Sequence, residues 1–168
     1  MTNILRFVQV FALGTWVGSI FYFSAAVAPA AFRVLANQDQ AGQLIEFTLR
    51  RLHTIGVFAG MIFLFASAGL AMVGEVSGET LVLPKTGKAQ LLPVAGVILM
   101  LVFTIISQHV VIRRMHQLRA QMVSVASTPP DNPLRAEFDR LHQWSVRLEG
   151  SVLLLGFASL FLTVRRPS

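Results

Sequence analysis

Apolar residues lie along this chain in four long blocks, and not in short alternating runs. The blocks cover about residues 7–31, 54–74, 91–112 and 146–164. Each is close to the roughly 20 residues that an α-helix needs to cross the hydrocarbon core of a bilayer. Because backbone groups inside lipid must bond to one another, each block is expected to be a helix. The pattern therefore predicts an all-α integral membrane four-helix bundle that forms a single transmembrane domain over residues 1–168.

The connections between the first three blocks differ in kind. Residues 33–53 begin with polar positions and continue as an amphipathic run, in which Leu49 and Leu52 stand beside Arg50 and Arg51. This run predicts a helix that lies at the membrane interface and leads into the second span. Residues 75–90 contain many turn-forming and charged residues, and we expect an ordinary loop there.

The longest polar segment covers residues 113–145. Its first part, from Arg113 to about Ser127, can extend the third helix beyond the membrane, but the consecutive prolines that follow must end that helix. Asn132 can then cap a new helix with Pro133 at its first position. The segment predicts a helical hairpin that projects from one face of the membrane and leads into the fourth span.

Composition agrees with a membrane location. Of the 168 residues 54% are hydrophobic and only 13% are charged, and a soluble domain of this size could not bury so much apolar surface. The net charge is +6, but the basic residues stand at the ends of the apolar blocks and in short loops, where they contact lipid headgroups. We therefore expect the lipid bilayer, and no nucleic acid, as partner. The chain has no cysteine, so thiolate metal sites and disulfides are excluded.

Basic residues are distributed unevenly between the two sides. The segments 33–53 and 113–147 together carry nine arginines out of 14 basic residues in the chain. The positive-inside rule then places the 33–53 and 113–145 loops in the cytoplasm and both termini outside.

The histidines gather at the same face. His53 opens the second block, His109 and His116 lie on either side of the end of the third, and His142 precedes the fourth. His109 and His116 are seven positions apart and hence share one helical stripe with Arg113. Imidazoles on facing helices can hold haem b or a divalent metal, so a ligand site is one hypothesis. The alternative is that these side chains stay in interfacial water and contact headgroups.

Glu149 is the most informative single residue. It lies about one turn inside the fourth block, where an unpaired carboxylate is costly. With His142 and Ser145 it forms a second helical stripe. We expect the carboxylate to face the bundle and to find His109, Arg113 or a hydroxyl of the first helix as partner, or else to reach interfacial water.

Small residues and one tryptophan mark the interior of the bundle. Gly14 with Gly18, and Gly56 with Gly60, form faces that allow helices to approach closely, and we expect them to pack within the bundle and not at a homodimer seam. Trp16 lies deep in the first block, away from the interfaces where tryptophan is common. Its indole N–H therefore needs an interior partner or pocket.

Three stretches carry a likeness to a known group. The first runs from Trp16 to Phe32; it opens with Trp16-Val17-Gly18-Ser19 and closes with Val27-Ala28-Pro29-Ala30-Ala31-Phe32. The second covers Gln108 to Arg114, and the third covers Phe138 to Ser145. In these the chain resembles the transmembrane protein 205-like family, domain of unknown function 4149. The resemblance implies four helices, a bacterial inner-membrane or eukaryotic endomembrane setting and no established enzymology. Animal members are linked with altered handling of platinum drugs, which implies export of a small molecule or metal. The family commonly has an Asn near the position of Glu149, so a role is not carried over to that residue.

No phosphate-binding glycine loop, nucleophile elbow or zinc-protease motif is present. The leading hypothesis is a non-enzymatic membrane protein that binds or transports a small molecule or metal, as a homo-oligomer or with a complex partner. The alternatives are a haem-binding redox protein and a scaffold or accessory subunit. The candidate ligand-binding residues are Trp16, His109, Arg113, His142, Ser145 and Glu149, and the candidate metal ligands are His53, His109, His116 and His142.

Overall fold

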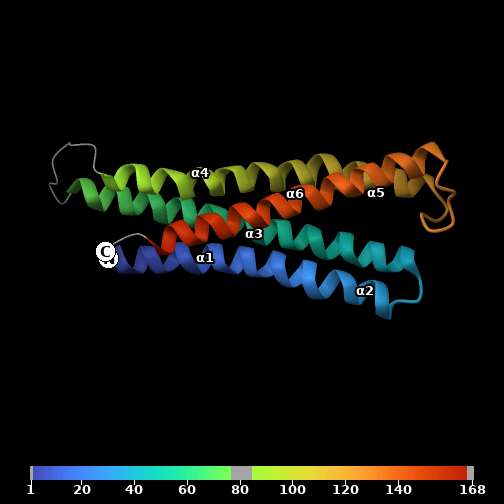
Figure 1. The fold of residues 1–168 in the computed structure, drawn as a ribbon, viewed down its shortest axis with the longest axis horizontal. Helices are drawn as coiled ribbons and strands as arrows, with labels where there is room; N and C mark the ends of the chain where they lie inside the picture. Colours follow the sequence, from blue (N-terminus) through green and yellow to red (C-terminus); the bar gives the residue numbers. More distant parts are fainter. Residues whose placement is uncertain (1, 77–84, 166–168) are drawn as a thin grey trace.

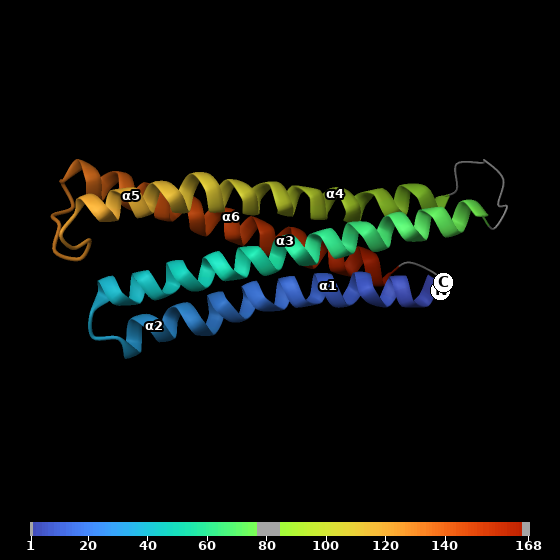
Figure 2. The same ribbon diagram turned by 180° about the vertical axis from the view of Figure 1, so that it is seen from behind.

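The computed structural model describes residues 2–76 and 85–165. Over these residues it is built of long helices that run up and down beside one another (Figures 1 and 2). Within the described residues, four helical segments are long and apolar enough to cross a membrane: Thr2–Val34, Gln38–Val73, Leu91–Gln121 and Pro133–Val164. The predicted four-helix membrane bundle is thereby confirmed, and the chain is an integral membrane protein.

The first span contains a short π-helical segment. Helix α1 (Thr2–Tyr22) passes into the π-helix η1 (Phe23–Val27) and then into α2 (Ala28–Val34). Within η1 the Ala28 N–H bonds to the carbonyl of Phe23, five positions back. Pro29 follows directly and has no N–H to donate, and its ring crowds the preceding turn of an α-helix. The wider π turn accommodates the proline without ending the span.

The second span is one helix, α3 (Gln38–Val76). It begins after Asn37, whose side chain accepts a hydrogen bond of 2.8 Å from the Asp39 N–H. The amphipathic run predicted as an interfacial helix is helical, and it leads into the second span as expected, without a break. Leu49 and Leu52 are buried in the bundle, and this packing draws the run into the long helix.

The third and fourth spans meet at the predicted hairpin. Helix α4 (Lys85–Ile106) continues through the π-helix η2 (Ser107–Ile112) into α5 (Arg113–Gln121). This helix ends at Gln121, before the predicted Ser127, because Met122 takes an extended backbone. Helix α6 (Pro133–Val164) starts as predicted, with the Asn132 side chain accepting a 2.9 Å bond from the Leu134 N–H. A loop was expected over residues 75–90, but residues 75–76 belong to α3 and residues 85–90 to α4, so the expectation is wrong there; residues 77–84 lie outside the described residues.

The spans pack as neighbours around a square. Helix α1 packs most closely against α3, and α4 against α6, while α1–α6 and α3–α4 contacts close the bundle. The side chains of Leu13, Trp16, Phe63 and Met100 are fully buried in its interior. The start of α1 and the end of α6 lie at one end, and the α5–α6 hairpin lies at the other, which we call the hairpin end (Figure 1).

Of the two glycine pairs predicted to allow close helix contact, only one does so. A Cβ on Gly56 would lie 2.3 Å from Trp16 Nε1, and one on Gly60 would lie 2.8 Å from Leu101, so both glycines permit close helix contact as expected. The expectation for Gly14 and Gly18 is wrong, because a Cβ on either meets nothing within 4 Å. The buried residues of α1 are on the Trp16 side of the helix, which turns the two glycines away from its neighbours.

The hairpin is fastened to the start of α3. Asp39 accepts hydrogen bonds from the Ser124 hydroxyl and, at 3.0 Å, from the Val125 N–H. Arg135 of α6 binds the Val125 carbonyl from the other side and also pairs with Asp139 at 2.9 Å. The loop between α5 and α6 is therefore held by both of the helices that it approaches.

We expect Gly156→Ala to destabilise the protein by about 1–3 kcal/mol, because overpacking forces stiff neighbours to move. The new Cβ would lie 2.5 Å from Val17 Cγ2 and 3.1 Å from Met100 Cε. Gly150→Ala, at an exposed position of the same helix, is the control, since its Cβ would meet nothing within 4 Å. Unfolding in detergent measures both, and equal stabilities would contradict the packing described.

Stability is also expected to depend on Asp39 at low pH. The Ser124 hydroxyl, followed by backbone N–H groups, holds the pKa of Asp39 below the usual 3.8. A carboxyl group whose pKa is lower in the folded protein than in the unfolded chain stabilises the fold at pH values above the unfolded-state pKa. This stabilisation is lost as the pH falls through the folded-state pKa. Asp39→Asn should therefore lower the unfolding temperature at pH 7, and the difference from wild type should shrink below about pH 4. Asp131→Asn, at an exposed position, is the control. A difference in unfolding temperature between Asp39→Asn and wild type that stays constant with pH would refute the role of the Asp39 carboxylate.

Candidate functional site

The centre of the site is a buried histidine–carboxylate pair between α3 and α6. His53 Nε2 lies 2.5 Å from Glu149 Oε1, and the two side chains are 2% and 13% exposed. Ser107 donates its hydroxyl to the same carboxylate oxygen at 3.3 Å. Gln108 Oε1 lies 2.9 Å from His53 Nδ1, so both ring nitrogens are engaged. Three spans thus contribute to one polar network, which we call the His53 network (His53, Ser107, Gln108 and Glu149).

The π-helix η2 supplies two neighbouring members of this network. Ser107 and Gln108 are its first two residues, and both contact the pair. In an α-helix successive side chains point about 100° apart, whereas the wider π turn reduces that angle. This local widening helps both side chains to reach the same partners, and π turns of this kind are frequent at functional sites.

The arrangement can accommodate two protonation states of His53. As Gln108 stands, its carbonyl oxygen faces Nδ1 and can accept from an Nδ1–H, which both an imidazolium and the neutral Nδ1–H tautomer carry. Rotation of the Gln108 amide would present its NH₂ group instead, and this suits a neutral imidazole. The network therefore has a neutral partner that can follow the gain or loss of a proton on the ring.

The surroundings of the network are apolar on one side and open on the other. Ile112 and Val152, close to its members in sequence, belong to the buried hydrophobic core. Between α3 and α4 a cavity of about 180 Å³ reaches His53 and Gln108, and exposed His109 and Phe58 also line it. The buried imidazole is therefore not sealed off by side chains, because this cavity opens on the side of the bundle beside exposed Phe58.

Trp16 and Gln9 also carry polar groups inside the bundle. The Trp16 indole N–H is buried beside Gly56, one helical turn from His53, and has no hydrogen-bond partner among the described residues. Farther from the hairpin end, buried Gln9 donates to the Ser67 hydroxyl at 2.6 Å. Trp16 is thus in the interior as expected, but the partner expected for its N–H is not found among the described residues.

The structure separates the other candidate residues. His116 is 64% exposed and lies 3.0 Å from Glu46, while His109, Arg113 and His142 are exposed and Ser145 is buried. Among the described residues no group of three or more His, Asp or Glu side chains is placed to hold a metal.

The predicted partners of Glu149 are wrong. In place of His109, Arg113 or a hydroxyl of the first helix, it binds His53 of the second span and Ser107 of the third. Sequence reasoning placed His53 at the mouth of its span and missed Gln108. The available signal was that His53 is three positions before Gly56, on the face of α3 that packs into the bundle.

The chain matches a family described only as a domain of unknown function, DUF4149, over residues 11–124. It belongs to that family. The match includes His53, Ser107 and Gln108 but ends before α6, so Glu149 lies outside it. The search of curated proteins and the search of solved structures each returned no match.

A double-mutant cycle should show that His53 and Glu149 stabilise each other. We expect a coupling free energy of about 1–3 kcal/mol between His53→Ala and Glu149→Ala, since the hydrogen bond is buried and charge-assisted. The same cycle on His116 and Glu46 is the matched control, because that histidine is exposed and its coupling should stay below about 1 kcal/mol. Unfolding titrations in detergent measure both, and equal couplings would argue against a special pair.

Proposed function

We propose that this protein binds a small divalent cation at the His53 network and exchanges it for protons, as a non-enzymatic transport component of the membrane. The observation that carries the proposal is the buried pairing of His53 with Glu149 inside a four-span bundle. Ionisable residues within spans are costly, and those that are present commonly mark ion pathways or proton relays.

The donor set of the network suits an exchangeable ion. It offers one imidazole nitrogen, one carboxylate, one hydroxyl and one amide oxygen. Imidazole favours ions such as Zn²⁺, and oxygen donors complete a mixed shell. Since only two of these groups are strong ligands, a bound ion would keep water in its shell. Such an ion is held less firmly than in a structural site and can leave again.

Proton exchange follows from the pairing itself. A cation that binds His53 and Glu149 takes the place of the proton between them, so that binding releases a proton. The cavity lined by His53 and His109 supplies a route from the surface. We infer that the hairpin end lies in the cytoplasm because of its excess of arginines. A bacterial inner membrane is inferred from the likeness to the transmembrane protein 205-like group alone.

Four helices are few for a carrier that must open to both sides, so we infer an assembly with further copies or with another subunit. The likeness to the transmembrane protein 205-like group supports a role in handling a small molecule or metal. Two of the three stretches that carry this likeness, residues 16–32 and 108–114, lie within the family match.

The haem alternative has less support from the geometry. Haem ligation needs imidazoles with a free nitrogen directed at a common space. His53 is the only buried histidine among the described residues, and His109, His116 and His142 are exposed on separate stretches of the bundle. The accessory-subunit alternative predicts that no ion moves at all, and the following experiment distinguishes it from cation exchange.

The test uses the full chain in liposomes with a zinc-sensitive dye and a pH dye inside. On addition of Zn²⁺ we expect zinc entry together with proton exit, and Glu149→Gln should reduce the rate about tenfold or more. His109→Ala should slow entry with a smaller effect, since it lines the route and not the pair.

Glu137→Gln is the matched control, because it makes the same change on the same helix at a surface pair with Arg114. It should leave zinc and proton movement unchanged. Fluxes in wild-type liposomes equal to those in protein-free liposomes, or equal fluxes for Glu149→Gln and Glu137→Gln, would overturn the proposal.

A further inference from the structure

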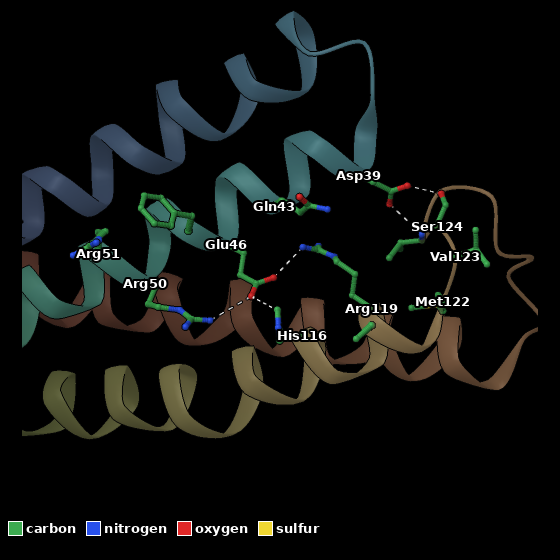
Figure 3. A pocket seen from close by; sticks show the side chains of 13 residues that line it. Asp39, Gln43, Glu46, Arg50, Arg51, His116, Arg119, Met122, Val123 and Ser124 are labelled. Carbon is green, nitrogen blue, oxygen red and sulfur yellow. Dashed lines mark hydrogen bonds and ion pairs between the residues drawn. The ribbon is translucent and has the colours of Figure 1, made fainter.

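A second polar site lies at the hairpin end, and its character differs from that of the His53 network. There α3, α5 and the following loop enclose an open cleft of about 800 Å³, which we call the hairpin cleft (Figure 3). Its wall contains three arginines, two carboxylates and one histidine: Arg50, Arg51, Arg119, Asp39, Glu46 and His116.

The carboxylates of the cleft are already occupied. Glu46 stands at its centre and accepts from Arg119 at 2.9 Å, from His116 at 3.0 Å and from Arg50 at 3.5 Å (Figure 3). Asp39 is saturated by the loop. Three guanidinium groups therefore face two satisfied carboxylates, and the cleft keeps an excess of positive charge and of N–H donors.

One arginine is built into the base of the cleft. The Arg119 guanidinium lies 5.5 Å from the centre of the Phe138 ring, and its side chain is only 18% exposed. It fits against α3 because residue 42 is glycine; a Cβ there would lie 2.9 Å from Arg119 Nη2. Its buried Nε has no partner among the described residues. By contrast Arg50 is 53% exposed and holds Glu46 only at long range, so its donors can serve a ligand at the rim.

The rim of the cleft leads onto an apolar face. Arg51 lies over the Phe47 ring, which is 60% exposed. Farther along α3, Ile55, Phe58 and other exposed apolar side chains follow at spacings that keep them on the same face of the helix. In a spanning helix this face lies against lipid chains. A cationic cleft thus opens directly above a strip of membrane-facing surface.

We propose that the hairpin cleft binds the phosphodiester headgroup of an anionic phospholipid, whose acyl chains lie along the exposed face of α3. Arg50 and Arg51 bind the phosphate at the rim, and Arg119 sets the positive potential from the base. Basic pockets between spans are suited to anionic headgroups, and a free phosphate would make no use of the apolar strip. A lipid seated there would also bridge α3 to the hairpin.

The experiment is a lipid titration of the full chain in detergent, followed by native mass spectrometry. Wild type should bind phosphatidylglycerol more tightly than phosphatidylcholine. The double variant Arg50→Gln with Arg51→Gln should lose affinity for phosphatidylglycerol by roughly 10- to 30-fold, as expected when two arginines leave a phosphate. Thermal unfolding of each variant without lipid checks that the fold is retained.

Arg33→Gln with Arg140→Gln removes the same charge from exposed positions outside the cleft, and it should retain wild-type affinity. An equal loss in both double variants would mean that surface charge alone attracts the lipid and would overturn the proposal. Displacement of the lipid by millimolar inorganic phosphate would show a headgroup site that does not need the acyl chains, which also contradicts it.

Discussion

A carboxylate inside a lipid bilayer must be paired or protonated, and the placement of Glu149 in this bundle follows from that constraint. The side chain meets His53 of the second span and Ser107 of the third. Satisfying one charge therefore fixes the relative heights of three helices. A shift of any of them along its axis would leave a buried polar group without its partner, which is far costlier than a shift between purely apolar faces.

The packing of the rest of the interior is consistent with the relative heights of the helices that these hydrogen bonds require. Where spans approach closely, a glycine stands opposite a bulky side chain, as with Gly56 under Trp16 and Gly156 against Val17. Where the chain needs two neighbouring polar side chains on one side, the third span widens into a π turn at Ser107. Packing and polar contacts thus require the same arrangement of helices.

Glu149 and Glu46 each stand at the centre of a polar site, and their surroundings differ. Glu149 pairs with a histidine that is only 2% exposed, and the proposed exchange of a cation or a proton rests on that pairing. Glu46 pairs with Arg50 and His116, which are 53% and 64% exposed, and with Arg119 at the base of an open cleft, where we propose that an anionic headgroup binds. Water therefore screens the exposed partners of Glu46 far more than it screens His53.

Much of the fold could be predicted from the sequence, because lipid imposes a simple rule on length and polarity. The four spans, the break at the consecutive prolines and the cap at Asn132 all follow from residues close together in the chain. The amphipathic run before the second span was expected to lead into that span, and it does so as the first part of α3. The role predicted for Gly14 and Gly18 was wrong, because a small face permits close contact but does not choose a neighbour.

By itself the sequence determined that Glu149 would need a partner and that Trp16 would need an interior place, since both follow from the cost of polar groups in lipid. Only the tertiary structure decided that the partner is His53 and that Gln108 completes the network. His53 and Glu149 are 96 positions apart, and their meeting depends on how far each helix is rotated and shifted against its neighbours. Those rotations come from side-chain packing throughout the bundle, and no local pattern in the chain encodes them.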